Sequence, residues 1–267
     1  MIKNHFCRSL ISIILLLAIG CAVTGPGGKK SFILIGSDTE TSIGQDMDQA
    51  VRQQNRMLQD SLWQNYVGDI GQKIVEVCDR KDISYHFAVI DSNMVNAFAA
   101  PGGYIYIYTG LLKSMDNEAE LASVIAHEIS HVVGRHSVKR LQAAMGVALV
   151  EQLVLGQSSE AMRAVVNIGM GLAFASYSRS DENEADNFGI QYMVRAGYNP
   201  QAAVTMFEKL ASMSDGTPSF FESLTMSHPD TQERIANSRA LIEPMKPLPS
   251  SLVYGRETYQ KMKNRLK

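Results

Sequence analysis

Five consecutive residues, His127-Glu128-Ile129-Ser130-His131, have the types and the spacing of a hydrolytic metal site. Residues four apart lie on one face of an α-helix, so the two imidazoles can bind a single metal ion. The carboxylate of Glu128 would lie beside that ion, where it can deprotonate a bound water molecule. Because so short a pattern also arises by chance, the rest of the chain must supply a third ligand, a suitable fold and a compartment.

A catalytic zinc ion needs a third protein ligand and one open position, and Glu182 with Asp186 is the better candidate pair. These residues are four apart and share a helix face. Glu182 can ligate the ion while Asp186 accepts the free ring N–H of a ligand histidine, which fixes its tautomer. Glu184 points about 200° away from Glu182 on a regular helix, so both cannot serve one ion. The alternative is a solvated acidic helix start.

His136 is the other candidate for the third ligand. A different class of metallopeptidase has its third histidine six residues after the second, with a glycine between them. Gly134 fits that pattern, but position 137 is Ser137 and the histidine falls one residue early. One position is about 100° around a helix, which argues against ligation. His136 is then a surface histidine or one that supports a ligand.

The elements that must position these residues follow from the periodicity of apolar side chains. We expect helices, in chain order, at Asp46 to about Arg80, Asp116–Val133 (with Asp116 as N-cap and Gly134 as the stop), Val138–Leu155 and Glu160–Tyr177. We expect strands at Tyr85–Ile90, Val95–Ala99 and Tyr104–Tyr108. The predicted fold class is therefore α+β and mainly helical, with a small β-sheet beside the helix of His127 and His131.

The apolar stretches Val138–Leu155 and Glu160–Tyr177 raise the question of a membrane span. The first is interrupted by Glu151 and the second by Arg163, so neither offers the run of about 20 apolar residues that a span needs. We expect buried or partner-facing helices. Contact with a membrane, or a mobile cover over the site, are the alternatives.

The first 20 residues have the features of a secretory signal. Lys3 and Arg8 give a cationic start, and an apolar run follows from Leu10 to Ile19. The segment ending at Cys21 resembles the lipobox of bacterial lipoproteins, in which cleavage precedes a lipid-carrying cysteine. Because Ala22 is not aspartate, this resemblance implies an anchor in the outer membrane that faces the periplasm. An ordinary signal peptide cut elsewhere is the alternative.

We divide the remaining chain into a flexible tether at 21–45, a metallopeptidase domain at 46–245 and a solvated tail at 246–267. After signal removal and lipidation, Cys78 is the single free thiol and cannot form an intramolecular disulfide. We expect it to be a small buried side chain. No basic cluster indicates a nucleic-acid partner.

The motifs together resemble the CAAX-prenyl-protease, HtpX and BepA family of zinc metallopeptidases. They are Asn96-Ala97-Phe98-Ala99 before Pro101-Gly102-Gly103, Glu118-Ala119-Glu120-Leu121, Ala126 with the His-Glu motif, Ser178-Arg179 before Glu182, Ala185-Asp186, and Ser227-His228-Pro229. The resemblance covers about residues 46–240 and implies a zincin-like domain that holds one Zn²⁺ through His127, His131 and Glu182. Glu128 would be the general base.

The same resemblance implies roles for His228 and Arg234. In BepA-like relatives the corresponding histidine can occupy the open position of the zinc and keep the enzyme latent. Transition-state stabilisation and a plain helix start are the alternatives for His228, and Arg234 lies where the family has an arginine near the site. The strand of Tyr104, Ile105, Tyr106, Ile107 and Tyr108 precedes the active-site helix as a substrate-binding edge strand would. An ordinary interior strand is the alternative.

Three functional hypotheses remain from the sequence. The first is a lipid-anchored zinc endopeptidase that cleaves misfolded or misassembled envelope proteins and works beside the outer-membrane assembly machinery. The second is a non-proteolytic chaperone for outer-membrane proteins that uses the same groove. The third is a lipoprotein in which zinc only stabilises the fold. Glu128 favours the first, because a structural zinc site needs ligands but no general base.

Overall fold

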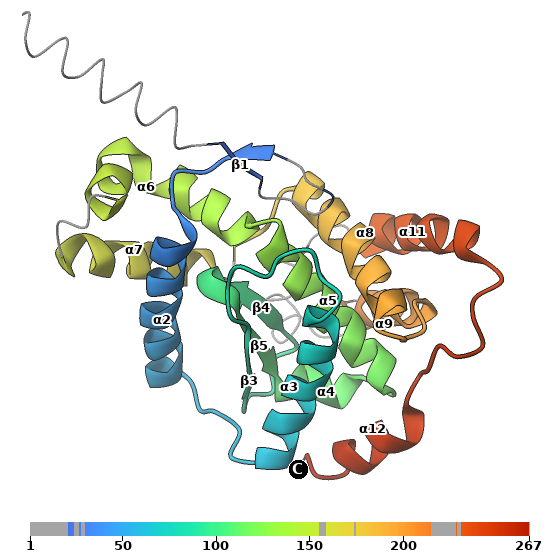
Figure 1. Cartoon of the computed structure of the whole chain (residues 1–267). Coiled ribbons are helices and arrows are strands. Elements are labelled where there is room, and N and C mark those ends of the chain that lie inside the picture. The colour runs from blue at the N-terminus through green and yellow to red at the C-terminus, as the bar shows by residue number, and fades with distance from the viewer. Residues whose placement is uncertain are drawn as a thin grey trace, which may run out of the picture.

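A small β-sheet lies between two layers of helices in the computed structural model, which describes residues 21–23, 27, 30–154, 159–173, 175–214, 228 and 231–266 (Figure 1). The signal segment expected at 1–20 lies outside the described residues. The predicted class, mainly helical α+β, is confirmed.

The sheet has three strands, β3 (His86–Ile90), β4 (Ala97–Ala100) and β5 (Tyr104–Tyr108), in the order β3-β5-β4. β5 runs parallel to β3 and antiparallel to β4. The expectation of an edge strand at Tyr104–Tyr108 is therefore wrong, because both sides of β5 are paired. The outer strand next to β5 on the side of the antiparallel pair is β4.

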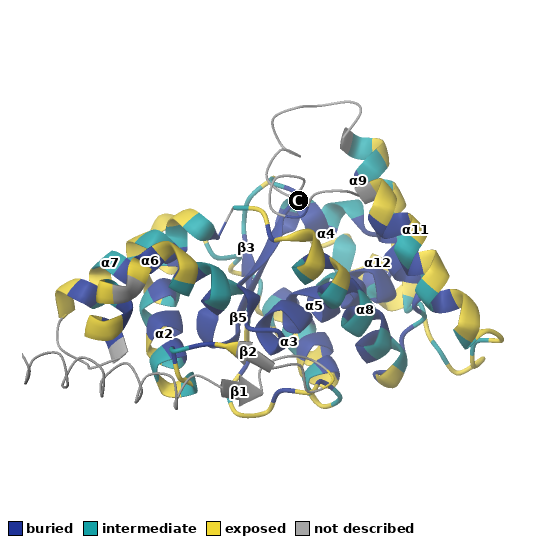
Figure 2. Cartoon of the chain, turned by 90° about the horizontal axis from the view of Figure 1, so that it is seen from above, coloured by how far each residue is buried: buried dark blue, intermediate teal, exposed yellow. Residues whose placement is uncertain are grey.

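The alternation of side chains along β5 explains how one strand serves two cores. Ile105 and Ile107 belong to one hydrophobic cluster, whereas Tyr104, Tyr106 and Tyr108 belong to the other. Both faces of the sheet are covered, so every residue of β5 is buried (Figure 2). A strand with helices on both faces has no polar side, which is why its sequence reads as continuously apolar and aromatic.

The larger layer surrounds α5 (Glu118–Val133), which is buried along almost its whole length. Its other members are α3 (Ser61–Val75), α4 (Thr109–Ser114), α8 (Arg179–Arg195), α9 (Gln201–Ser214), α11 (Thr231–Ile242) and α12 (Arg256–Lys263). α8 and α9 pack directly on α5, and α11 packs on both of them. This layer brings residues from four separate parts of the chain around the His-Glu motif.

The smaller layer consists of α2 (Ser37–Gln54), α6 (His136–Val154) and α7 (Ser159–Leu172). A short hairpin of β1 (Cys21–Val23) and β2 (Lys30–Phe32) precedes it. α6 and α7 match the two predicted apolar helices and pack on each other and on α2. Among the described residues no helix is both long and apolar enough to span a bilayer. The described residues also include two one-turn 3-10 helices, Pro101–Gly103 and Glu243–Met245.

The segments predicted as a tether and a tail both contribute side chains to the core. The expected tether contains Ile33, Ile35 and Ile43, which are buried, and α2 begins inside it. The expected tail contains α12, whose Tyr259 is fully buried and donates a hydrogen bond to the carbonyl of Leu112 at 2.7 Å. Few apolar residues mark the C-terminal segment, whereas the run Phe32-Ile33-Leu34-Ile35 in the expected tether was a signal that the prediction overlooked.

Two local predictions also need correction. The helix expected from Asp46 to Arg80 is two helices, α2 and α3, separated at residues 55–60. The N-cap of α5 is Asn117, not Asp116: the Asn117 side chain accepts from the backbone N–H of Glu120. The predicted stop at Gly134 is confirmed as the C-cap.

Candidate metal centre

The His-Glu motif lies in the middle of the molecule on α5. His127 and His131 are both buried, and their Nε2 atoms lie 3.0 Å apart. The helical spacing of four therefore aims both imidazoles at the same point, as the sequence predicted. Glu128 is buried between this point and the neighbouring pocket.

Glu182 reaches the same point from α8. Its Oε1 atom lies 3.4 Å from His131 Nε2, and its Oε2 atom lies 3.5 Å from His127 Nε2. Ser178 caps this helix by accepting from the backbone N–H of Asp181, so Glu182 sits in the first turn. The polar run before Glu182 is thus the start of a helix that packs on α5.

The spacing of the donor atoms fits a zinc ion. Ligand atoms about 2.0–2.1 Å from a tetrahedral zinc ion are about 3.3 Å apart. The three separations among His127, His131 and Glu182 range from 3.0 to 3.5 Å. Two imidazoles and one carboxylate are also a donor set typical of catalytic zinc sites.

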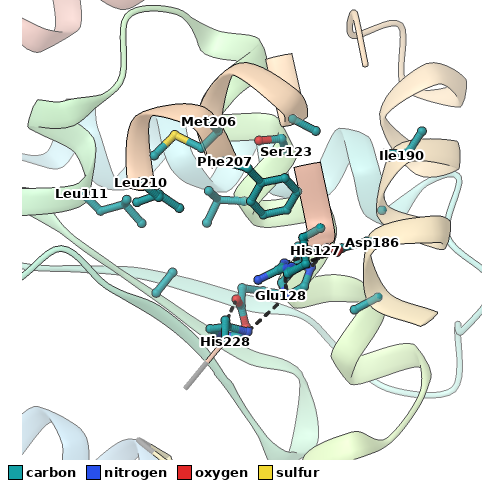
Figure 3. Close-up of a pocket in the computed structure, with 16 residues that line it drawn as sticks. Leu111, Ser123, His127, Glu128, Asp186, Ile190, Met206, Phe207, Leu210 and His228 are labelled. Carbon is teal, nitrogen blue, oxygen red and sulfur yellow. Dashed lines mark hydrogen bonds and ion pairs between the residues drawn. The ribbon is translucent and has the colours of Figure 1, made fainter. Parts of the chain in front are cut away.

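His228 completes the cluster from outside these two helices. Its Nδ1 atom lies 2.9 Å from Glu182 Oε1 and 3.3 Å from His127 Nε2. The potential ligand atoms of His127, His131, Glu182 and His228 all lie within 4.8 Å of one another. His228 Nε2 points toward Glu128, at 3.6 Å from its Oε1 atom (Figure 3). A fourth donor therefore stands where a tetrahedral ion would have its remaining position.

Asp186 and Arg234 support the cluster from behind. Asp186 Oδ1 lies 2.8 Å from His127 Nδ1, the ring nitrogen that faces away from the cluster. Arg234 donates to both carboxylate oxygens of Asp186, at 2.8 and 2.7 Å, and its Nη1 atom lies 3.0 Å from Glu182 Oε2. One guanidinium from α11 thus connects the two carboxylates of α8.

His136 lies beside the cluster and contributes no atom to it. Its Nδ1 atom is 2.8 Å from His131 Nδ1, on the far side of that ring. Tyr177 was not singled out in the sequence, yet its ring stacks on His131, with centroids 3.9 Å apart. Its position four residues before Asp181 gave no signal, because aromatic contact with a ligand depends on the packing of separate segments.

The surroundings of His131 and Glu182 favour the charge state of each that binds a metal. Burial lowers the pKa of His131 well below its usual value, which keeps its imidazole neutral. Burial by itself would raise the pKa of Glu182, but the charges of His228 and Arg234 hold it well below its usual range. Asp186 is also lowered in pKa, since Arg234 outweighs the effect of burial. Contact with Glu182 raises the pKa of His228 against the effect of burial.

An apolar pocket opens beside Glu128 and His127 (Figure 3). Its far wall is formed by Met206, Phe207 and Leu210 on α9. The remaining apolar lining residues include Leu111, Val124, Ile190 and Ala97. This pocket was not predicted, although the spacing of Ala203, Met206, Phe207 and Leu210 indicates an apolar helix face.

The part of the sheet nearest the pocket is β4, whose Ala97 is one of the lining residues. α5 packs against this strand. The hydroxyl of Ser137 donates to the carbonyl of Ala99 at 3.0 Å, so β4 is also joined to α6. The prediction of a small sheet beside the active-site helix is confirmed, and both β4 and β5 pack on α5.

The chain is similar in sequence to known peptidases. The sequence model of peptidase family M48 matches residues 61–242. A beta-barrel assembly-enhancing protease of Yersinia pestis is 30% identical over 234 residues, which are 84% of this chain and 48% of the relative. Mitochondrial metalloendopeptidase OMA1 of Schizosaccharomyces pombe is 31% identical over 173 residues, 64% of this chain and 50% of the relative. Metalloprotease YcaL of Escherichia coli strain K12 is 33% identical over 159 residues, 58% of this chain and 61% of the relative.

The chain spans about half the length of the first curated relatives that it matches. The matched family segment contains the cluster residues on α5 and α8 together with His228 and Arg234.

Proposed function

This chain belongs to peptidase family M48 and is a zinc metallopeptidase, and from that premise we propose that it cleaves internal peptide bonds of unfolded or misassembled proteins of the bacterial cell envelope. The observation that carries the proposal is Glu128. Its Oε2 atom is buried without a hydrogen-bond partner among the described residues, beside three donors that fit zinc. A zinc ion that only stabilised the fold would need no such carboxylate.

Each residue then has a defined task. His127, His131 and Glu182 would hold the ion, and Asp186 accepts the ring N–H of His127 so that Nε2 keeps its lone pair for the ion. When bound, zinc supplies a Lewis acid that acidifies a water molecule and polarises the scissile carbonyl. The Glu128 carboxylate takes the proton of the attacking water and delivers it to the nitrogen of the leaving amine.

The apolar pocket supports an unfolded substrate. A pocket lined by Met206, Phe207 and Leu210 takes a large apolar side chain, and such side chains are buried in folded proteins. The pocket reaches Glu128 and His127, so the side chain that fills it belongs to a residue next to the cleaved bond. The same pocket favours the second candidate function, the holding of unfolded outer-membrane proteins without cleavage.

His228 is proposed to hold the enzyme latent. Its Nδ1 atom lies as close to Glu182 and His127 as a fourth ligand would, and its Nε2 atom faces the base. A histidine in that position excludes the attacking water. Activation therefore requires His228 to move away.

Attachment to a membrane and the place of action stay proposals from the sequence and the relatives. We propose that Cys21 carries lipid and anchors the domain at the outer membrane, facing the periplasm. The name of the Yersinia pestis relative associates that protein with beta-barrel assembly. By analogy, we propose outer-membrane proteins and their assembly machinery as the substrates and partners of this chain.

The test is proteolysis by the full chain with zinc removed and restored. An unfolded polypeptide should be cleaved, a chelator should stop cleavage, and added Zn²⁺ should restore it. Mass spectrometry should find a large apolar residue next to each cleaved bond. Cleavage that persists without zinc would contradict the metallopeptidase mechanism, and binding of the polypeptide without any cleavage, also after His228→Ala, would favour the chaperone function.

A further inference from the structure

His136 is buried against the ligand His131 and has no role in the mechanism above. We propose that His136 is a positioning residue, which accepts the ring N–H of His131 and transmits the orienting effect of carboxylates on α8. This inference rests on the proposed ligation of zinc by His131. It assigns to the second ligand histidine the kind of support that Asp186 gives to the first.

The geometry defines the donor and the acceptor in each hydrogen bond. His131 Nε2 faces the cluster, at 3.0 Å from His127 Nε2, so this nitrogen must carry the lone pair that binds zinc. The proton of His131 is then on Nδ1. Because His131 Nδ1 lies 2.8 Å from His136 Nδ1, His136 must present a lone pair there.

The other side of the His136 ring agrees with this assignment. With a lone pair on Nδ1, its proton is on Nε2, which lies 3.3 Å from Glu184 Oε1 and 3.4 Å from Asp181 Oδ1. Ionised carboxylates only accept hydrogen bonds, so both contacts require that proton. The opposite tautomer would turn a lone pair toward two carboxylates and take the lone pair of His131 away from the cluster.

The backbone before His136 is shaped to place this ring. Arg135 has a φ of 53°, a left-handed conformation that is uncommon for residues other than glycine. Its guanidinium is held by buried Glu40, with Nη2 at 2.8 Å from Oε2. A Cβ atom on Gly134 would lie 2.3 Å from His136 Nε2, so the ring needs a glycine at that position.

The backbone leaves the helical conformation at residues 134–135, so His136 does not continue α5. On an unbroken α5, residue 136 would lie about 140° around the axis from His131. The break allows the imidazole to fold back against His131 Nδ1. Tyr177 stacks on one face of the His131 ring and fixes the orientation of the ring plane. The hydrogen bond to His136 fixes the direction of the His131 N–H bond.

The test compares two substitutions of His136 in the full chain. His136→Leu removes the acceptor, whereas His136→Asn keeps an acceptor oxygen near the position of Nδ1. Zinc affinity is measured by competition with a chromogenic chelator at one pH, with circular dichroism as the check of folding. We expect His136→Leu to weaken zinc binding about 10- to 100-fold and His136→Asn to recover most of the loss.

Nitrogen NMR of the zinc-loaded wild type gives a second readout that needs no variant. We expect a proton on His131 Nδ1, a proton on His136 Nε2 and a scalar coupling between the two Nδ1 atoms across their hydrogen bond. A proton on His136 Nδ1 would overturn the inference, as would equal zinc affinity of the wild type and His136→Leu. A wild type that binds no zinc would instead contradict the proposed function.

Discussion

Glu128 and His228 face each other across the buried cluster, and their contact is the basis for the proposed latent state. His228 Nε2 lies 3.6 Å from Glu128 Oε1 and has no hydrogen-bond partner among the described residues. A buried nitrogen without a partner costs free energy, so its position needs compensation. Ligation of zinc by His228 Nδ1 would supply that compensation, which is the physical basis of the proposed latent state.

Replacing His228 by alanine should raise the rate of cleavage of an unfolded polypeptide. The substitution frees the fourth position and the approach to Glu128. X-ray absorption at the zinc edge should show one imidazole fewer in the first coordination shell. His86→Ala is the matched control, because His86 is exposed on β3 and stacks on Tyr104.

Two outcomes would change this account of His228. A slower rate with an unchanged coordination shell would make His228 a transition-state stabiliser. An unchanged rate and an unchanged shell would leave it no functional role.

Single residues of the site were predictable where the signal was local. The spacing of His127 and His131, and of Glu182 and Asp186, depends only on the helical repeat, and both pairs lie as expected. The contact between His131 and His136 was not predictable. It requires the left-handed Arg135, and periodicity does not reveal the conformation of a residue between two helices.

Among the secondary-structure elements, two features could not be predicted from the sequence. They are the order of the strands in the sheet and the docking of α12 on the domain. β5 was recognised as a strand, but its place between β3 and β4 depends on pairing between distant segments. α12 has few apolar residues, and it packs through Tyr259, which lies edge-on to Trp63 with ring centroids 5.9 Å apart. Tyr259 is the buried residue of α12, and its contact is one that composition does not show.

Replacing Tyr259 by alanine should lower the free energy of unfolding by about 3–5 kcal/mol, since a fully buried aromatic ring leaves a cavity. Tyr259→Phe keeps the ring and loses only the hydrogen bond to the Leu112 carbonyl, for about 1 kcal/mol. Urea denaturation measures both. Equal stability of Tyr259→Ala and the wild type would show that α12 does not dock on the domain in solution.

At the scale of the whole molecule, buried Glu40 joins segments that are far apart in the chain. Its carboxylate accepts from both terminal nitrogens of Arg80, at 3.0 and 2.9 Å, and pairs with Arg135 at 2.8 Å. The backbone N–H of Gly102 also donates to it, at 3.3 Å. Glu40 thus connects α2 to the β4–β5 turn and to the start of α6, directly before His136.

Replacing Glu40 by alanine should cost about 3–5 kcal/mol of unfolding free energy, because two buried guanidinium groups lose their counter-charge. We also expect weaker zinc binding, since Arg135 then loses the partner that holds its conformation. Thermal or urea unfolding with a parallel zinc titration measures both effects. Glu76→Ala is the control, because Glu76 is exposed at the end of α3. A loss of stability without any change in zinc affinity would separate this network from the metal centre.

The cleavage rate of Glu128→Gln shows whether Glu128 acts as the base of a zinc peptidase. Three zinc-loaded proteins are compared on the same unfolded polypeptide: His228→Ala alone, which lacks the proposed latch, and the same variant with either Glu128→Gln or the exposed control Glu160→Gln added. We expect Glu128→Gln to bind one zinc ion per chain and to lose cleavage by at least about 100-fold, whereas the control cleaves normally. Equal cleavage rates in all three proteins would rule out Glu128 as the base.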